Sequence, residues 1–260
     1  RQICRLAGVT VATKRVAYLT MQDESDYVTD YHLSFAPMQS LGWRVETVAW
    51  RSNPDWNQFD AVYICAPWDY PQHCDEFRAV LERIDASTAV LFNDKSLIDW
   101  NLEKTYLRDV AARGGNIVPS SWYESFDAAA VPGFFTEHAC DTLVIKPTIG
   151  ANAQDTFVLN NPVDVALVER LATVFKSQRF FVQPFIDNIK TEGEYSLFFF
   201  NGDYSHAILK TPEAGDFRVQ EEHGAAINAC APPETLLRVA NEVFSHIQPL
   251  PLNGRGDWVR

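Results

Sequence analysis

The sequence predicts a mixed α/β and α+β protein that begins with a doubly wound parallel sheet. Over residues 15–95, short apolar runs rich in β-branched residues alternate with amphipathic stretches. These runs are apolar throughout, which is typical of strands buried on both faces of a parallel sheet. From residue 96 onward the pattern changes to helices separated by pairs of strands with turn residues between them. At 260 residues, 47% of them hydrophobic, the chain can bury several cores.

The first predicted domain, residues 15–95, is a series of strand–helix–strand units. Its predicted strands are RVAYLT (15–20), WRVETVAW (43–50), DAVYICA (60–66) and TAVLFN (88–93). Its predicted helices are YHLSFAPMQSLG (31–42), which Gly42 closes, and PQHCDEFRAVLERI (71–84). Ligands collect at the carboxyl ends of such strands, so we expect Trp68, Asp69 and Tyr70, which follow the third strand, to contact a substrate.

Two further units are predicted, over residues 96–180 and 181–260. The first opens with a helix over NLEKTYLRDVAARGG (101–115) and ends with a helix over PVDVALVERLATVF (162–175). The second contains the strand RFFVQPFI (179–186) and a hairpin, YSLFFFNG followed by DYSHAILK, whose NGD sequence is a turn. A helix over PPETLLRVANEVFSHI (232–247) and a last strand in LPLNGRGDWVR (250–260) complete it.

Composition excludes several classes of function. The chain has 34 acidic and 22 basic residues, a net charge of −12, which repels nucleic acid and anionic membranes. No apolar run approaches the ~20 residues that span a bilayer, and residues 1–14, whose role stays open, lack the apolar centre of a secretion signal. We therefore expect a cytoplasmic protein. Its five cysteines form no CxxC pair, so neither a disulfide framework nor a zinc site is indicated.

A lysine, Lys146, lies between two apolar runs of the second predicted unit. In LVIKPTIGANAQDTFVL (143–159) two predicted strands flank a loop with Gly150, and Lys146 lies where the first strand ends. Inward-turned backbone N–H groups of such a loop can bind an anion, and the lysine adds a positive charge for phosphate. The alternative is a plain hairpin whose lysine extends to water.

Five stretches follow one another in an order that narrows these alternatives: APWDYPQ, IKPTIGANAQDT, VQPFI, TEGEYSLFFFNGDYSHAILKTP and GRGDWV. In this order and spacing the chain, from about residue 15 to residue 260, resembles the ATP-grasp superfamily. It is most similar to the glutathione-synthetase-like ATP-binding proteins that include D-cycloserine synthetase and D-alanine:D-alanine ligase. The resemblance implies an ATP-grasp fold with an N-terminal pre-ATP-grasp domain, and the use of ATP with Mg²⁺ or Mn²⁺.

The resemblance also assigns roles to individual residues. It places Lys104, on the predicted helix 101–115, and Lys146 at the phosphates, with Gly150 in a covering lid. Gln183 would meet the adenine edge through its side chain, and the backbone around Phe185 and Ile186 would read N6 and N1. Glu194 would accept the ribose hydroxyls, and Lys210 would face the γ-phosphate. Arg218, in a DFR segment with Asp216, would grip a substrate carboxylate.

The last strand is predicted to hold the metal. Mg²⁺ takes oxygen ligands, usually one or two carboxylates with phosphate oxygens, and Asp257 supplies such a group. Arg255, two residues earlier, should lie on the same side of the strand and could neutralise the transferring phosphoryl group. In the family another acidic residue and an asparagine follow on the next strand. Since this sequence stops three residues after Asp257, we expect the full protein to continue.

The function implied is an ATP-dependent ligase that joins a small carboxylate substrate to an amine or similar nucleophile through an acyl phosphate. A homodimer is compatible with this reading. Two alternatives stay open: an ATP-grasp small-molecule kinase, and a regulatory protein that binds nucleotide without catalysis. The sequence contains neither a GxSxG elbow nor a GxGxxG after its first strand, so serine hydrolase and Rossmann dinucleotide chemistry are not indicated. We expect loops such as WDYPQ and PEAGDFRVQ to set substrate identity.

Overall fold

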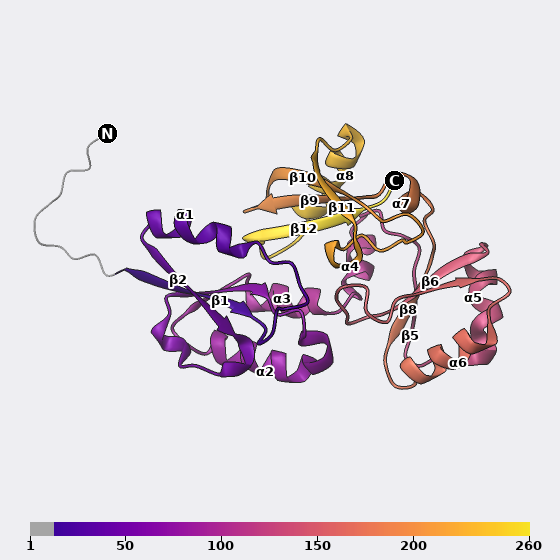
Figure 1. Ribbon diagram of the computed structural model, residues 1–260, viewed down its shortest axis with the longest axis horizontal. Helices are drawn as coiled ribbons and strands as arrows, with labels where there is room; N and C mark the ends of the chain where they lie inside the picture. The colour runs from indigo at the N-terminus through magenta and orange to yellow at the C-terminus, as the bar shows by residue number, and fades with distance from the viewer. Residues whose placement is uncertain (1–12) are drawn as a thin grey trace, which may run out of the picture. The chain divides into compact units, whose positions relative to one another are not determined.

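A computed structural model describes residues 13–260 and contains three four-stranded sheets (Figure 1). The chain divides between Lys95 and Ser96 into two compact units. We describe each unit by itself. The finer division of residues 96–260 into two subdomains stays a prediction.

The first unit is built on a parallel sheet of order β2-β1-β3-β4. Its strands are β1 (Lys14–Thr20), β2 (Trp43–Ala49), β3 (Ala61–Ala66) and β4 (Val90–Phe92), and its α-helices are α1 (Phe35–Ser40) and α2 (Cys74–Asp85). Short 3-10 helices lie at Tyr31–Ser34, Trp50–Ser52, Trp56–Gln58 and Tyr70–His73. The parallel, doubly wound arrangement predicted from the apolar runs is confirmed.

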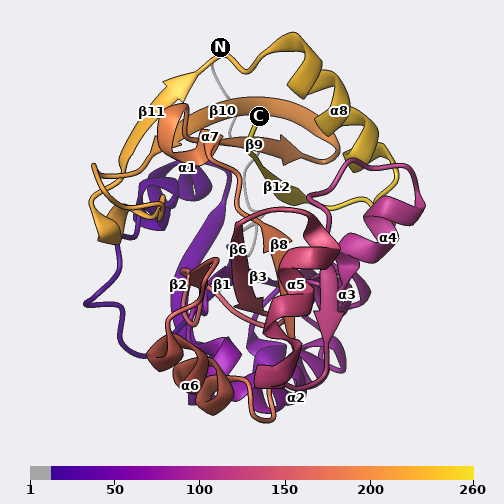
Figure 2. The same cartoon turned by 90° about the vertical axis from the view of Figure 1, so that its right-hand side faces the viewer.

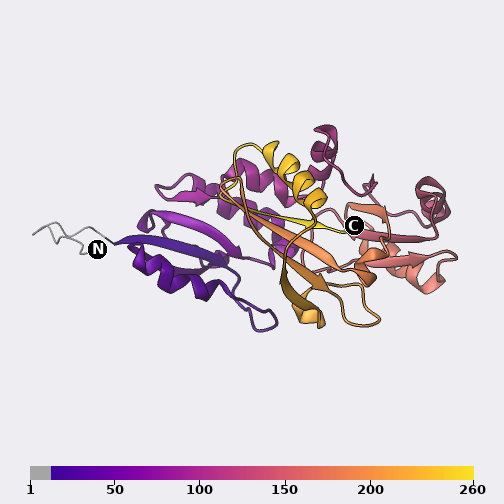
Figure 3. The same cartoon turned by 90° about the horizontal axis from the view of Figure 1, so that it is seen from above.

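Both faces of this sheet are covered, which explains why β1 is apolar without interruption from Val16 to Leu19. Val16 and Tyr18 point to the face that α1 packs on through Phe35, whereas the intervening Ala17 and Leu19 are fully buried on the other face. Helix α2 lies on that second side of the sheet (Figures 1 and 3). Strands buried on two faces cannot alternate polar and apolar residues.

The second unit begins with α3 (Lys95–Leu102) and α4 (Tyr106–Ala112), followed by an antiparallel sheet of order β5-β8-β6-β7. Its strands are β5 (Ser121–Tyr123), β6 (Thr142–Pro147), β7 (Phe157–Asn160) and β8 (Phe180–Pro184). The connections contain a 3-10 helix (Ala128–Ala130), α5 (Val131–His138) and α6 (Val165–Val174). The hairpin predicted around Lys146 is the pair β6 and β7.

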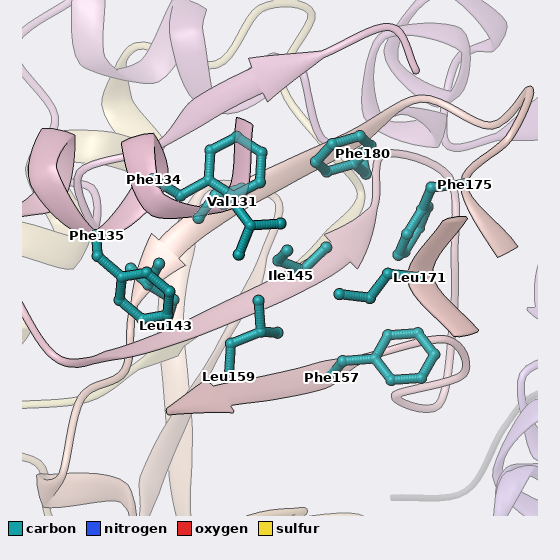
Figure 4. Close-up of a cluster of buried hydrophobic side chains, with 11 residues drawn as sticks. Val131, Phe134, Phe135, Leu143, Ile145, Phe157, Leu159, Leu171, Phe175 and Phe180 are labelled. Atoms are coloured by element: carbon teal, nitrogen blue, oxygen red, sulfur yellow. The ribbon is translucent and has the colours of Figure 1, made fainter. Parts of the chain in front are cut away.

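Helices α5 and α6 both contribute to the core on one face of this sheet, and α5 lies in front of β8 in Figure 2. The core between them is mainly aromatic and aliphatic (Figure 4), and it includes Phe134, Leu171 and Phe180. Fully burying one such side chain contributes ~1.5–3 kcal/mol. Because this face is filled by the core, the opposite face of the sheet is the one left for polar and charged side chains.

The remainder of the unit is a second antiparallel sheet of order β11-β10-β9-β12. Its strands are β9 (Glu194–Phe200), β10 (Asp203–Thr211), β11 (Ala226–Cys230) and β12 (Asn253–Trp258), with α7 (Asn188–Thr191), a 3-10 helix (Glu221–His223) and α8 (Glu234–Ser245) between them. Helix α8 packs on one face, where the rings of Phe199 and Phe244 stack 3.9 Å apart. The NGD turn is confirmed, with Asn201 and Gly202 both at positive φ.

One prediction about the elements is wrong, and one strand was not predicted. The helix expected over 101–115 is two helices, α3 and α4, which break at Glu103, Lys104 and Thr105. The break has a tertiary cause: the Lys104 N–H donates to the Thr148 carbonyl at 2.7 Å instead of continuing the helix. Strand β11, in the segment AINAC, was not anticipated from the sequence.

Among residues 13–260 no helix is both long enough and apolar enough to cross a membrane. Four of the five cysteines fall in this range, and Cys65, Cys74, Cys140 and Cys230 are free thiols. The fifth, Cys4, lies outside the described residues.

Candidate active site

The side of the first antiparallel sheet that faces away from α5 and α6 carries the lysine that the hairpin motif predicted. Residues directly opposite in an antiparallel pair share a face, and Lys146 lies opposite Phe181 while Val144 lies opposite Gln183. Lys146 and Gln183 therefore point to the same side, away from the core of α5 and α6. The Lys146 ammonium lies 5.1 Å from the centre of the Phe181 ring, a cation–π contact that positions the charge over the sheet.

Lys104 reaches the same region from the turn between α3 and α4. Its ammonium donates to the carbonyl of Gly150 at 2.6 Å, and its backbone holds Thr148, so one residue makes two bonds to the loop 148–156. Burial, assisted by the neighbouring charge of Lys146, lowers the pKa of Lys104 to about 8. The structure thus replaces the predicted helical position of Lys104 with a half-buried position in a turn beside the loop.

Lys146 is half-buried in the same way. Burial lowers its pKa from the ordinary lysine value, while the carboxylate of Glu194 acts in the opposite direction. Two ammonium groups that repel each other in a buried place are unfavourable unless an anion joins them. In a protein of net charge −12, this local excess of positive charge indicates a strongly anionic ligand.

The second sheet brings four predicted residues together on the face that α8 does not cover. Lys210 lies opposite Glu194 across the β9–β10 pair, and its ammonium is 2.5 Å from the Glu194 carboxylate and 3.5 Å from that of Asp257. Arg255 donates to the other oxygen of Asp257 at 3.1 Å, so the expected common side of the strand is confirmed. The result is a compact cluster of two carboxylates and two cations.

Charges within this cluster set its protonation. Burial, and then repulsion from Asp257, raises the pKa of Glu194. Burial also acts to raise the pKa of Asp257, but attraction to Arg255 and Lys210 and a 2.5 Å hydrogen bond from the Ser196 hydroxyl outweigh it, so the pKa of Asp257 is lowered. Asp257 is thus the carboxylate of the cluster that stays ionised most readily.

The cluster can be compared with the needs of a divalent cation. No group of three or more His, Cys, Asp and Glu side chains arranged to hold a metal ion occurs within residues 13–260. Mg²⁺, however, is usually bound by only one or two carboxylates together with substrate phosphate oxygens and water. The carboxylate oxygens of Asp257 and Glu194 fit that requirement.

The predicted adenine contacts lie at the end of β8. The Gln183 side chain is buried and donates from Nε2 to the Ser120 hydroxyl at 2.7 Å. The Phe185 N–H donates to the Thr142 carbonyl, so Phe185 has no backbone donor to offer a base. Ile186 makes no such backbone bond from its N–H within the described residues.

Arg218 is already partly engaged. Its Nε and Nη2 atoms bond the carboxylate of Asp216 at 2.6–3.1 Å, and this pairing holds the pKa of Asp216 well below its usual range. The two-pronged grip on a substrate carboxylate predicted for Arg218 can therefore use only the Nη1 side of the guanidinium. Phe217, between these two residues, packs against the ring of Phe185, which directly follows β8.

In the first unit, the expected substrate residues have mixed roles. Asp69 accepts from the Trp50 indole N–H at 2.7 Å and faces Arg51 at 3.8 Å, which makes it a structural residue. Trp68 packs against Tyr27, 5.1 Å between ring centres. The structure does not assign a substrate contact to Trp68, Asp69 or Tyr70.

Two residues of the site were missed. Ser196 supports Asp257, and alternation from Glu194 could have revealed it, because residues i and i+2 of a strand share a face. Tyr106 was read as part of an apolar helix face, yet its pKa is raised by burial and then by the charge of Asp257. No pattern in the sequence signals this second contact, which arises from the packing of α4.

Comparisons with known proteins show which proteins this chain is similar to in sequence and fold. A family model described as the N-terminal domain of D-cycloserine synthetase DcsG matches residues 16–93. The cycloserine biosynthesis protein DcsG of Streptomyces lavendulae is 30% identical over 177 residues, which are 66% of this chain and 59% of that protein. The chain thus spans less than two thirds of this curated relative's length.

Solved structures extend the likeness to nearly the whole chain. The crystal structure of D-cycloserine synthetase DcsG is 28% identical with a TM-score of 0.83, covering 95% of this chain and 86% of that one. D-alanine–D-alanine ligase from Bacillus anthracis (12%, TM-score 0.64, 95% and 83% covered) and the ATP-grasp ligase PsnB (16%, 0.61, 94% and 85%) share the fold. The chain therefore has the fold of these ATP-grasp ligases, and it is similar to D-cycloserine synthetase in sequence and in fold.

Proposed function

We propose that this protein is an ATP-dependent ligase that activates a small carboxylate as an acyl phosphate and joins it to an amine. The observation that carries the proposal is the set of four cations, Lys104, Lys146, Lys210 and Arg255, gathered with Asp257 within one unit of an acidic protein. Such a set matches a triphosphate whose terminal group is to be transferred.

The roles follow from where each charge lies. Lys104 and Lys146, buried beside the loop 148–156, hold phosphate oxygens of ATP, and Ile186 and Gln183 hold the base. Lys210 and Arg255 lie beside Asp257 and stabilise the charge of the phosphoryl group in transfer. The adenine and ribose assignments, including Glu194 at the ribose, rest on the family resemblance; the ion pair of Glu194 with Lys210 favours a place nearer the phosphates.

The chemical sequence needs no nucleophilic side chain. A carboxylate oxygen of the substrate attacks the γ-phosphorus, the bond to the bridging oxygen of ADP breaks, and an acyl phosphate forms. The amine then attacks the acyl carbon and loses a proton as inorganic phosphate leaves. Holding reactants in register can lower a barrier by ~7–11 kcal/mol, which is consistent with a site made of positioning charges.

Mg²⁺, or Mn²⁺ in its place, suits the oxygen donors of Asp257 and Glu194. When bound it would neutralise phosphate charge. The chain's own part is to keep Asp257 ionised, which Arg255, Lys210 and the Ser196 hydroxyl do. Glu194, whose pKa is raised by burial, would become a better ligand once a cation lowers that pKa.

The names of the relatives support a proposal for the substrate class. D-cycloserine synthetase and D-alanine–D-alanine ligase are named for amino acids or their derivatives, and the free Nη1 side of Arg218 can meet a carboxylate. We therefore propose an amino acid or a similar small acid, handled in the cytoplasm, with no role for nucleic acid or membrane.

The experiment is a screen of amino acids and small acids for ADP production by the full-length protein, with and without an amine. We expect one acid to stimulate ADP release and an amine to complete the reaction. Lys146→Ala and Asp257→Ala should lose turnover while the folded state, followed by circular dichroism, is retained. Wild-type rates in both variants would reject the site, and ADP release that proceeds fully without an amine would indicate phosphorylation rather than ligation.

A further inference from the structure

The side-chain amide of Gln183 can be oriented in two ways, and a neighbouring hydroxyl fixes which one occurs. Gln183 is buried on the charged face of the first antiparallel sheet, the face shared with Lys146 and opposite the aromatic core. Ser120, just before β5, lies beside it and receives the hydrogen bond from Nε2. Nothing in the proposed catalytic roles uses Ser120.

A second hydrogen bond of Ser120 determines which group donates and which accepts in its contact with Gln183. The Ser120 hydroxyl donates its hydrogen to the Val118 carbonyl at 2.7 Å. A carbonyl can only accept, so the Ser120 oxygen presents a lone pair to Gln183 and must be met by the NH₂ group of the amide. The opposite orientation of the amide would place two acceptors 2.7 Å apart. Ser120 therefore holds the Gln183 carbonyl oxygen, Oε1, away from itself.

With the NH₂ group of Gln183 bonded to Ser120, the amide oxygen Oε1 is the atom left to bond a ligand, and it is a hydrogen-bond acceptor. Within residues 13–260 no group donates a hydrogen bond to Gln183 Oε1. This oxygen is not one of the fully buried side-chain atoms that lack a partner, so it is not sealed off from a ligand. An acceptor at the base site accepts a hydrogen bond from an exocyclic amino group, such as N6 of adenine. The carbonyl oxygen of a 6-oxopurine is itself an acceptor, so the two oxygens would repel each other. An amide free to turn would accommodate both.

We propose that Ser120 is a positioning residue for base selection: by fixing the Gln183 amide it makes the site favour a 6-aminopurine nucleotide over a 6-oxopurine nucleotide. This inference rests on the proposed function, because it assumes that the nucleotide base lies at the end of β8. It adds a residue that acts through Gln183 without touching the base.

The test compares ATP with inosine triphosphate by calorimetry on the full-length protein with magnesium, so it needs no knowledge of the acid. In Ser120→Ala the amide can turn and donate to the 6-oxo group, and we expect the ratio of ATP to inosine triphosphate affinity to fall about five- to tenfold, the effect of one neutral hydrogen bond. Inosine triphosphate should bind Ser120→Ala more tightly than it binds the wild type, which simple damage to the site would not produce. Ser120→Thr keeps the hydroxyl and should restore the ratio.

The next residue gives a matched control. Ser121 also hydrogen-bonds through its hydroxyl, but to Glu137 on the opposite, core side of the sheet. Ser121→Ala should leave the ratio unchanged. In a Gln183→Leu background, Ser120→Ala should have no further effect on the ratio, since the hydroxyl would have no amide to orient.

The outcomes separate the two claims. If ATP binds and the ratio is the same in wild type and Ser120→Ala, the role of Ser120 is overturned while the nucleotide site stands. If neither triphosphate binds the wild type, the proposed function fails and the base-selection inference fails with it.

Discussion

Replacing Lys104 with methionine should stabilise the protein and abolish nucleotide binding together. The pKa of Lys104 is about 8 against an ordinary value of 10.5, a difference of ~2.5 units that corresponds to ~3 kcal/mol for keeping the ammonium charged at pH 7. The lost hydrogen bond to Gly150 removes ~1 kcal/mol. We therefore expect Lys104→Met to raise the free energy of unfolding by ~2 kcal/mol at pH 7.

The sign and the pH window follow from the direction of the shift. The unfolded chain binds the proton more tightly than the folded one, so the cost of Lys104 is complete below pH 8 and disappears as the pH rises through 10.5. The stability difference between variant and wild type, measured by urea unfolding, should shrink by ~2 kcal/mol between pH 7 and pH 9.5.

A control isolates burial from the loss of a lysine. Lys176 is exposed, and Lys176→Met should change stability by no more than ~0.5 kcal/mol at either pH. On this view the charged Lys104 lowers the free energy of unfolding but is needed to bind ATP. A Lys104→Met protein that is less stable than wild type at pH 7, or one that still binds ATP with wild-type affinity, would refute it.

The remaining predictions concern protonation and backbone. At pH 8 Lys104 is about half protonated. Because a bound phosphate raises the pKa of Lys104, nucleotide binding at this pH should be accompanied by uptake of about half a proton, which calorimetry in buffers of different ionisation enthalpy measures. In Lys104→Arg the side chain is always charged, so this group should take up no proton. Gly193 has φ of +100°, and a Cβ there would lie 2.4 Å from the Lys210 carbonyl, so Gly193→Ala should lose ~2–4 kcal/mol by urea unfolding. Gly133→Ala, with no atom nearby, should be neutral or slightly stabilising; equal losses in the two would contradict this account of Gly193.

Much of the site could be predicted because strand chemistry is periodic. Arg255 and Asp257, two residues apart on a strand, share a side as expected and bond each other. Lys146, a charge at the end of an apolar run beside a small-residue loop, lies on the polar face of its sheet as that pattern indicated. These predictions depend only on alternation along a single strand, so they hold wherever the strand itself forms.

What could not be predicted depends on tertiary contacts. The helix pattern around Lys104 is broken because the loop 148–156 offers carbonyl groups at Thr148 and Gly150 that a turn can reach. Ser120 and Ser196 are ordinary serines in the sequence, and only the register of the sheets brings each beside its partner. The pairing of Arg218 with Asp216 likewise limits a role that residue type alone suggested.

The most direct test of phosphoryl transfer to a carboxylate uses the acid identified by the ADP screen, labelled with oxygen-18 in its carboxylate. If an acyl phosphate forms between the residues grouped around Lys210 and Asp257, one labelled oxygen should appear in the inorganic phosphate for each product molecule formed. Phosphate that carries no label, released with normal turnover, would contradict the proposed chemistry.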